Sequence, residues 1–277
     1  MSDNDASANW RQASGQWSAM GSPQRPGTAD IDAARQVIAG LGGPRDAPPV
    51  AAILGVTPEL ASLPWPTGTR LLAIDNSRPM IDALWPAPGA PAGARAICAD
   101  WRAMPIADGA LDAVVGDGCY AAVALPDEGQ TVSRELRRTL RPNGIVAIRT
   151  YLRPAAPDDL EALRARLAGG GIGSVHALKW LIAFAVQPST AVGAKLADIW
   201  DAWQSLAPAA AALAGRPGWR AEEIASLGRY RGNTTRYHFP TIDEFRAIFA
   251  DDLQEAACIT KDYELGDLCP TFILRPR

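Results

Sequence analysis

The sequence predicts an α/β fold: a doubly wound, mainly parallel seven-stranded sheet that ends in an antiparallel hairpin and carries an inserted helical cap. Three observations indicate it. Short apolar runs alternate with helical patterns from residue 50, a long helical stretch interrupts them, and two further runs close the chain around a short turn. Strands that alternate with helices form right-handed parallel crossovers, whereas runs joined by a tight turn pair in antiparallel fashion.

Five nearly continuous apolar runs are expected to form the parallel strands, because strands covered on both faces lack polar alternation. They are residues 50–55, 70–74, 94–99, 111–115 and 145–151. The expected helices are residues 28–41, 58–63, 79–85 and 129–140. Residues 141–144 read Arg-Pro-Asn-Gly and predict that the last of these helices stops in a turn.

Residues 152–240 show helical and loop patterns but no clear strand. Thr241 and Glu244 then form a capping box ahead of an amphipathic helix. Residues 253–263 and 269–274 are expected to pair as a hairpin through 264–267. The predicted organisation is an N-terminal arm and helix acting as a lid (1–43), a core (44–151 plus 241–277) and a helical insertion (152–240).

Composition limits the classes of partner. The 277 residues are 48% hydrophobic and carry a net charge of −3, with no run of basic residues to follow a nucleic-acid backbone. No segment is long and apolar enough for a membrane span, and no secretory signal is present, so we expect a cytoplasmic protein without nucleic-acid or membrane partners. Four separated cysteines and two histidines predict no metal site.

The residues that follow each strand are the candidates for ligand binding, because ligands of open parallel sheets bind at the carboxyl ends of the strands. Gly55 and Thr57 follow the first strand, where the structural alternative for the glycine is a tight turn. Asp75 follows the second strand, about twenty residues later, and a carboxylate there can accept both hydroxyls of a ribose. An Asx turn or a helix cap is the alternative for Asp75 and, more strongly, for Ser77.

The third and fourth strand ends add further candidates. Asp100 can accept from an adenine amino group while Trp101 covers the ring, although a capping aspartate is the alternative interpretation. Gly116 and Gly118 would let the backbone approach a ligand closely.

These four strand ends and the terminal hairpin together resemble the class I methyltransferases that use S-adenosylmethionine, over residues 49–151 and 241–277. The resemblance implies that S-adenosylmethionine is the cofactor and S-adenosylhomocysteine the product. It assigns Gly55 and Thr57 to the methionine part, Asp75 to the ribose, and Asp100 and Trp101 to the adenine. The full set of implied cofactor contacts is Gly55, Thr57, Asp75, Asn76, Ser77, Met80, Asp100, Trp101, Gly116, Asp117 and Gly118.

The first loop departs from the family pattern, because Thr57 and Glu59 stand where further glycines are usual and Ile53 replaces a common acid. A nicotinamide-binding fold fits less well, since the sequence has no GxGxxG turn after a strand. The N-terminal arm carries Trp10, Trp17 and Met20 at near-helical spacing, and Arg25 can meet a carboxylate. We therefore expect the arm, with Trp17 and Arg25, to close over the cofactor.

Methyl transfer from a sulfonium depends largely on alignment, so no fixed catalytic motif is required. An oxygen or nitrogen acceptor can need a base, and the candidates are His238, Tyr237, Asp117, Tyr120 and Tyr151. The insertion is expected to cap a small-molecule acceptor or to form a homodimer interface through its tryptophans. A non-catalytic protein of this fold that binds S-adenosylmethionine or a nucleoside is the alternative function.

Overall fold

The computed structural model describes residue 17, residues 20–43 and residues 46–277, and it contains a seven-stranded sheet in the order β3-β2-β1-β4-β5-β9-β8. The first five strands run parallel, while β9 lies antiparallel to both β5 and β8, which confirms the predicted fold class. The strands are β1 (Val50–Leu54), β2 (Arg70–Asp75), β3 (Arg95–Cys98), β4 (Leu111–Asp117), β5 (Leu140–Arg149), β8 (Leu253–Ile259) and β9 (Thr271–Pro276).

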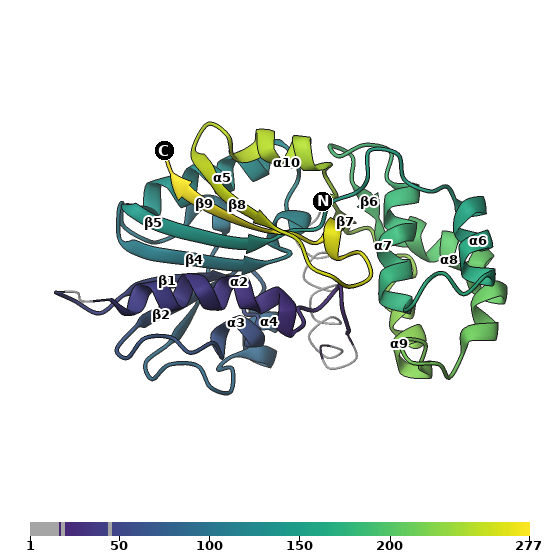
Figure 1. Ribbon diagram of the computed structural model, residues 1–277, viewed down its shortest axis with the longest axis horizontal. Helices are drawn as coiled ribbons and strands as arrows, with labels where there is room; N and C mark the ends of the chain where they lie inside the picture. Colours follow the sequence, from purple (N-terminus) through teal and green to yellow (C-terminus); the bar gives the residue numbers. More distant parts are fainter. Residues whose placement is uncertain (1–16, 18–19, 44–45) are drawn as a thin grey trace.

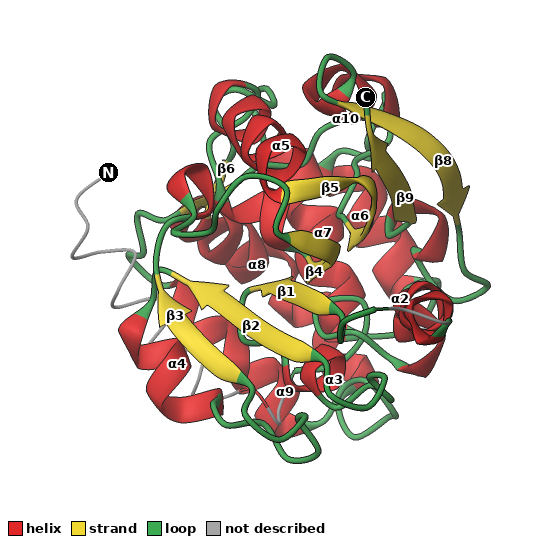
Figure 2. Cartoon of the chain, turned by 90° about the vertical axis from the view of Figure 1, so that its left-hand side faces the viewer, coloured by secondary structure: helices red, strands yellow, loops and turns green. Residues whose placement is uncertain are grey.

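Helices cover both faces of the sheet (Figures 1 and 2). One face packs against α2 (Thr28–Ala39), α3 (Pro58–Ala61) and α4 (Arg78–Leu84), and the other against α5 (Asp127–Thr139) and α10 (Ile242–Phe249). Successive side chains of a strand point to opposite faces, so Val115 of β4 joins the first layer and Val114 the second. This double burial explains the nearly continuous apolar runs of the central strands β1 and β4. The capping box predicted at Thr241 and Glu244 starts α10, as expected.

The turn predicted at residues 141–144 was wrong in part. Helix α5 does end there, at Thr139, but β5 starts immediately at Leu140 and contains the Arg-Pro-Asn-Gly segment. The pairing with β4 shifts register between Leu111 and Ala113, so the segment is accommodated as an irregularity within a strand. Nη1 of Arg141 lies 2.7 Å from Oδ1 of buried Asp112 in β4. Residues 141–144 themselves pair with no residue of β4, because the register passes from Leu140 to Ile145.

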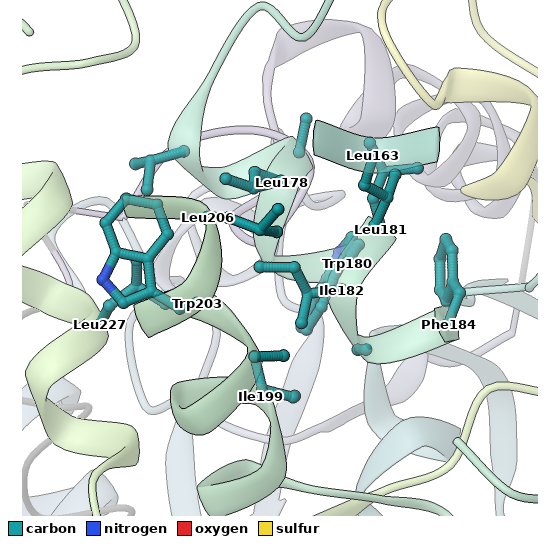
Figure 3. Close-up of a cluster of buried hydrophobic side chains, with 14 of the residues drawn as sticks. Leu163, Leu178, Trp180, Leu181, Ile182, Phe184, Ile199, Trp203, Leu206 and Leu227 are labelled. Carbon is teal, nitrogen blue, oxygen red and sulfur yellow. The ribbon is translucent and has the colours of Figure 1, made fainter. Parts of the chain in front are cut away.

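The insertion is a helical body beside the sheet (Figure 1). It consists of α6 (Leu160–Ala168), α7 (Val175–Val186), α8 (Leu196–Ala210) and α9 (Ala221–Ala225). Helix α7 is apolar on nearly all sides and forms the centre of a separate hydrophobic cluster, in which Trp180, Trp203 and Leu206 lie among aliphatic side chains (Figure 3). A two-residue ladder of β6 (Ala194–Lys195) and β7 (Arg236–Tyr237) is the one departure from the strand-free prediction.

The terminal hairpin has a longer connection than predicted, because β8 ends at Ile259 and β9 begins at Thr271. The segment between them turns at Leu265, whose φ is 63°, and at Gly266, where an added Cβ would lie 2.3 Å from the Lys261 carbonyl oxygen. The connection brings Tyr263 back against α2, where its hydroxyl donates to Oδ1 of Asp30 at 2.6 Å. Among the described residues, no helix is long and apolar enough to cross a membrane.

Candidate active site

Gly55 and Asp75 meet at the carboxyl ends of β1 and β2. Gly55 has a φ of +97°, which disfavours any other residue, and its N–H donates to the Ile74 carbonyl at 2.7 Å. An added Cβ would stand 3.8 Å from Oδ2 of Asp75, an ordinary contact distance, so the backbone angle and not crowding demands glycine. The turn therefore places the Gly55 backbone close to the Asp75 carboxylate without crowding it. Thr57 is buried at the start of α3 and makes no side-chain cap bond.

Asp75 is a buried carboxylate, with 9% of its surface exposed. Burial raises its pKa from 3.8 to about 6, while the Ser77 N–H, which donates to Oδ1 at 2.7 Å, lowers it. A carboxylate in this state gains from further donors, and a ribose diol would supply two. Ser77 caps α4 by accepting from the Met80 N–H at 3.4 Å, as its alternative interpretation expected, and Asn76 is exposed beside it.

Asp100 and Trp101 lie at the end of β3, next to Asp75 in the sheet. The indole N–H of Trp101 donates to the Ile74 carbonyl at 2.6 Å, which fixes the ring across the end of β2. Asp100 accepts from the side chain of Arg102 at 2.9 Å and from its backbone N–H at 2.8 Å. The side-chain bond from Arg102 lowers the pKa of Asp100. An adenine amino group would therefore share this carboxylate with Arg102.

The end of β4 has two glycines, and a different physical constraint favours glycine at each position. Gly116 lies inside the sheet, where an added Cβ would stand 3.1 Å from Sγ of Cys119 and 3.5 Å from Leu54. Gly118 has a φ of +63°, and an added Cβ would lie 2.5 Å from the ring of Tyr151. Close packing accounts for the first glycine, and the approach of an aromatic ring accounts for the second.

Between these glycines, Asp117 belongs to a buried ionic network centred on Arg149. Arg149 donates through Nε to Asp117, and its Nη1 lies 3.3 Å from Oδ2 of Asp30 on α2. The hydroxyl of Tyr151 accepts from Nη2 at 3.2 Å. Burial raises the pKa of Asp117, and the charge of Arg149 opposes that shift. Sequence reasoning missed this network, because Asp30 reaches the strand end only through the packing of α2.

A cavity of about 90 Å³ opens beside Asp117 and Gly118. Its wall comes from three parts of the chain: the N-terminal arm, the ends of β4 and β5 with the segment after β4, and the helical insertion. The lining residues are Trp17, Met20, Gln24, Asp117, Gly118, Ala121, Ala122, Tyr151, Trp180, Arg229 and Tyr237. The cavity thus lies between the end of β4 and the insertion.

Three of the five predicted base candidates, Asp117, Tyr151 and Tyr237, line this cavity, and two do not. Tyr120 is buried in the sheet layer, with its hydroxyl 2.9 Å from the Ser133 hydroxyl. His238 is buried elsewhere, with Nδ1 2.8 Å from the Thr190 carbonyl oxygen, and burial lowers its pKa. The structure therefore does not bring Tyr120 and His238 to the cavity.

Of the arm residues predicted to contact the cofactor, one lines the cavity and one does not. Trp17 lines the cavity, whereas Arg25 donates to a carboxylate of the chain itself, Oε1 of Glu59, at 2.6 Å. The Trp17 indole N–H donates to the same oxygen at 3.4 Å, so Glu59 fastens the arm to α3. Trp10 lies outside the described residues. Within the described part of the chain, no group of three or more His, Cys, Asp or Glu side chains is arranged to hold a metal ion.

Comparisons with known proteins identify a domain family within the sheet. Residues 54–148, from the end of β1 to β5, match the methyltransferase domain family. No curated protein matches the chain.

Three solved structures share the fold at low sequence identity. A Rhodobacter sphaeroides protein, provisionally assigned to the Zn-dependent alcohol dehydrogenases, is 16% identical over 99% of this chain and 100% of its own, with a TM-score of 0.65. A provisionally assigned methyltransferase of Haloferax volcanii, in complex with the activator Trm112, is 12% identical over 96% and 93%, with a TM-score of 0.51. A Pyrococcus horikoshii OT3 protein is 14% identical over 90% of each chain, with a TM-score of 0.50.

The match covers the three strand-end sites at Gly55, Asp75 and Asp100, together with the end of β4. The strand order, with its reversed terminal hairpin, is that of the same class. Residues 54–148 therefore match a methyltransferase domain, and the sheet has the class I methyltransferase fold, whose members take their methyl group from S-adenosylmethionine.

Proposed function

We propose that the protein transfers the methyl group of S-adenosylmethionine to a small-molecule acceptor bound in the cavity beside Asp117 and Gly118. One observation carries this proposal: the cavity is walled on one side by the end of β4 and on the other by Trp180 and Tyr237 of the insertion. A class I methyltransferase needs its acceptor where the strand ends open, because the nucleophile must lie in line with the methyl group and the sulfur.

On the cofactor side, Asp75 would accept the ribose hydroxyls, and Gly55 and Thr57 would adjoin the methionine part. The raised pKa of Asp75 supports this role, because a buried carboxylate with one backbone donor is stabilised by further hydrogen bonds. Trp101 would cover the adenine and Asp100 would accept from its amino group. The remaining proposed contacts are Asn76, Ser77, Met80, Gly116, Asp117 and Gly118.

On the acceptor side, Asp117, Tyr151 and Tyr237 would position the nucleophile or take its proton. The acceptor then forms one bond to the methyl carbon while the carbon–sulfur bond breaks, and S-adenosylhomocysteine leaves with the electron pair. Asp117 is the strongest candidate for the proton, because it lines the cavity and burial raises its pKa. Its ion pair with Arg149 holds the carboxylate in a fixed orientation.

Each of the three parts of the cavity wall comes from a different segment of the chain, and each segment would have its own role. Residues 1–43 would form the lid, residues 44–151 and 241–277 the cofactor-binding core, and residues 152–240 the acceptor cap. The competing homodimer interface receives less support, because Trp180 and Trp203 are buried in the insertion's own cluster (Figure 3).

The test is isothermal titration of the full chain with S-adenosylmethionine and S-adenosylhomocysteine, followed by a screen of small acceptors for methyl turnover. We expect one site per chain for both ligands, and turnover with at least one acceptor. Binding without turnover across the screen would favour the non-catalytic alternative, and absence of binding would contradict the proposal.

A further inference from the structure

Arg229 is a buried cation in the wall of the cavity. It belongs to the short 3₁₀ helix η6 (Ser226–Tyr230) of the insertion, and only 8% of its surface is exposed. Its guanidinium lies 5.0 Å from the centre of the Tyr230 ring. Burial opposes its charge, whereas the phenolic groups of Tyr230 and Tyr237 favour it, and the pKa of Arg229 lies above its usual value. Arg229 therefore stays charged inside the protein.

No carboxylate of the described residues balances this charge. Nη2 donates to the Tyr230 hydroxyl at 3.3 Å and Nη1 to the sulfur of Met20 at 3.7 Å, and both acceptors are neutral. Buried Arg149 makes the contrast plain, because it contacts both Asp117 and Asp30. A buried charge without a partner is costly, so proteins keep one mainly where something else supplies the counter-charge.

The cavity also contains hydrogen-bonding atoms that nothing in the described part of the chain satisfies. Nε of Arg229 and Nε1 of Trp180 are buried N–H groups without an acceptor, and both residues line the cavity. Buried donors are ordinarily paired. An anionic group with two oxygens could accept from the guanidinium at more than one position, as carboxylates commonly do with arginine.

We propose that Arg229 binds a carboxylate of the acceptor, so that the enzyme methylates a small carboxylic acid with an apolar body. This inference rests on the proposed function, since it identifies the chemical class of the acceptor for the same site. The apolar body would lie against Met20, Trp180 and Tyr237, and the carboxylate would neutralise the guanidinium.

A carboxylate fits better than a phosphate ester or the cofactor's own carboxylate. A phosphate monoester carries about two negative charges and favours several cations, whereas Arg229 faces a cavity that also contains Asp117. Lys179 does not supply a second cation to the cavity, because it is not one of the lining residues. The proposed methionine contacts Gly55 and Thr57 do not line this cavity.

The experiment uses the full chain saturated with S-adenosylhomocysteine and two pairs of probes: butyrate with butyramide, and benzoate with benzamide. Tryptophan fluorescence and calorimetry measure binding, since Trp17 and Trp180 line the cavity. We expect at least one acid to bind about tenfold or more tightly than its amide, as a charge-assisted hydrogen bond predicts. Arg229→Met should abolish that preference and Arg229→Lys should keep part of it. The control Arg231→Met, at an exposed position two residues later, should retain it fully.

Equal binding of acid and amide by the native protein, or no binding of any probe, would overturn the inference. An unchanged preference in folded Arg229→Met would overturn it as well. A titration of Arg229→Met with S-adenosylhomocysteine separates the two sources of a carboxylate. Native affinity is expected, whereas a loss of tenfold or more would assign Arg229 to the cofactor. Failure of the native protein to bind S-adenosylhomocysteine would instead contradict the proposed function.

Discussion

At the scale of single residues, the affinity of an Asp75 variant for S-adenosylhomocysteine tests the predicted cofactor site. Its carboxylate is buried beside the Gly55 turn and has a single backbone donor in Ser77. We expect Asp75→Ala to weaken binding of S-adenosylhomocysteine at least tenfold, because a hydrogen bond to a charged group contributes roughly 1.5–3 kcal/mol. Calorimetry of the folded variant measures the loss. Asp82→Ala, which removes a carboxylate paired with Arg78 on the exposed side of α4, serves as the control and should bind normally.

The raised pKa of Asp75 also predicts a pH dependence of stability. A carboxyl group with a folded-state pKa of about 6 and an ordinary value of 3.8 binds more protons in the folded protein. Its favourable contribution is complete below pH 3.8 and is lost as pH rises through 6, by roughly 3 kcal/mol in total. Urea denaturation of the ligand-free protein should show Asp75→Asn gaining stability relative to the native chain between pH 4.5 and pH 7. Parallel pH profiles would refute this.

A comparison of Gly118 with Gly109 distinguishes two contributions to unfolding free energy: an unfavourable backbone angle and steric crowding. Gly109 and Gly118 have nearly the same φ, 60° and 63°, but an added Cβ meets nothing at Gly109 and the Tyr151 ring at Gly118. Gly109→Ala should therefore lose only about 1 kcal/mol of unfolding free energy, and Gly118→Ala clearly more. Chemical denaturation of both variants checks the difference. Equal losses would mean that Tyr151 moves aside freely.

The residues that sequence reasoning did not find share one property. No local motif places Asp30 or Arg229 at the site, because each reaches it only when distant segments pack together, Asp30 against Arg149 and Arg229 against the arm residue Met20. Asp75 and Asp100 could be predicted, because a polar residue that follows an apolar run is visible in the local sequence. The choice of Arg102 as partner for Asp100 could not.

At the scale of elements, the proposed role of the arm as a lid rests on its contacts with the rest of the chain. Met20 is buried, the ring of His176 lies 3.0 Å from where a Cβ on Gly21 would stand, and Arg25 holds Glu59 of α3. A chain that starts at Gly27 keeps the hydrogen bond at the start of α2, in which Asp30 accepts from the Gly27 N–H. This truncation tests the arm without removing that hydrogen bond.

We expect the chain that starts at Gly27 to keep the far-ultraviolet circular dichroism spectrum of the core. Because the arm lines the cavity beside Asp117, the truncated chain should bind S-adenosylhomocysteine with a dissociation constant severalfold higher than that of the full chain. Glu59→Gln, which weakens the anchor of Arg25 and leaves the arm in place, should show a smaller rise. An unaltered constant in the truncated chain would leave the arm without a role in cofactor binding.

Elements were predicted well where local pattern decides them, and less well where distant contacts do. The five parallel strands and α10 follow from apolar runs and a capping box, which are local signals. The start of β5 depends on the pairing of Leu140 with Leu111 of β4, which no local turn signal reports. The two-residue ladder of β6 and β7 is too short to leave a periodic pattern.

At the scale of the whole molecule, the sheet and the helical insertion are two bodies with separate hydrophobic clusters, and the cavity lies where they and the arm meet (Figure 1). The sheet order follows from the alternation of elements, but the cavity does not, because its wall gathers residues from Trp17 to Tyr237. Its composition therefore became clear only with the structure.

The central claim is that the cofactor binds across the ends of β1 to β4 with its sulfur facing this cavity. A crystal structure of the full chain with S-adenosylhomocysteine tests it most directly. We expect the ribose hydroxyls within hydrogen-bond distance of the Asp75 carboxylate and the sulfur directed into the cavity beside Asp117 and Gly118. A nucleoside bound away from Asp75, or a sulfur separated from the cavity by the Gly118 turn, would contradict it.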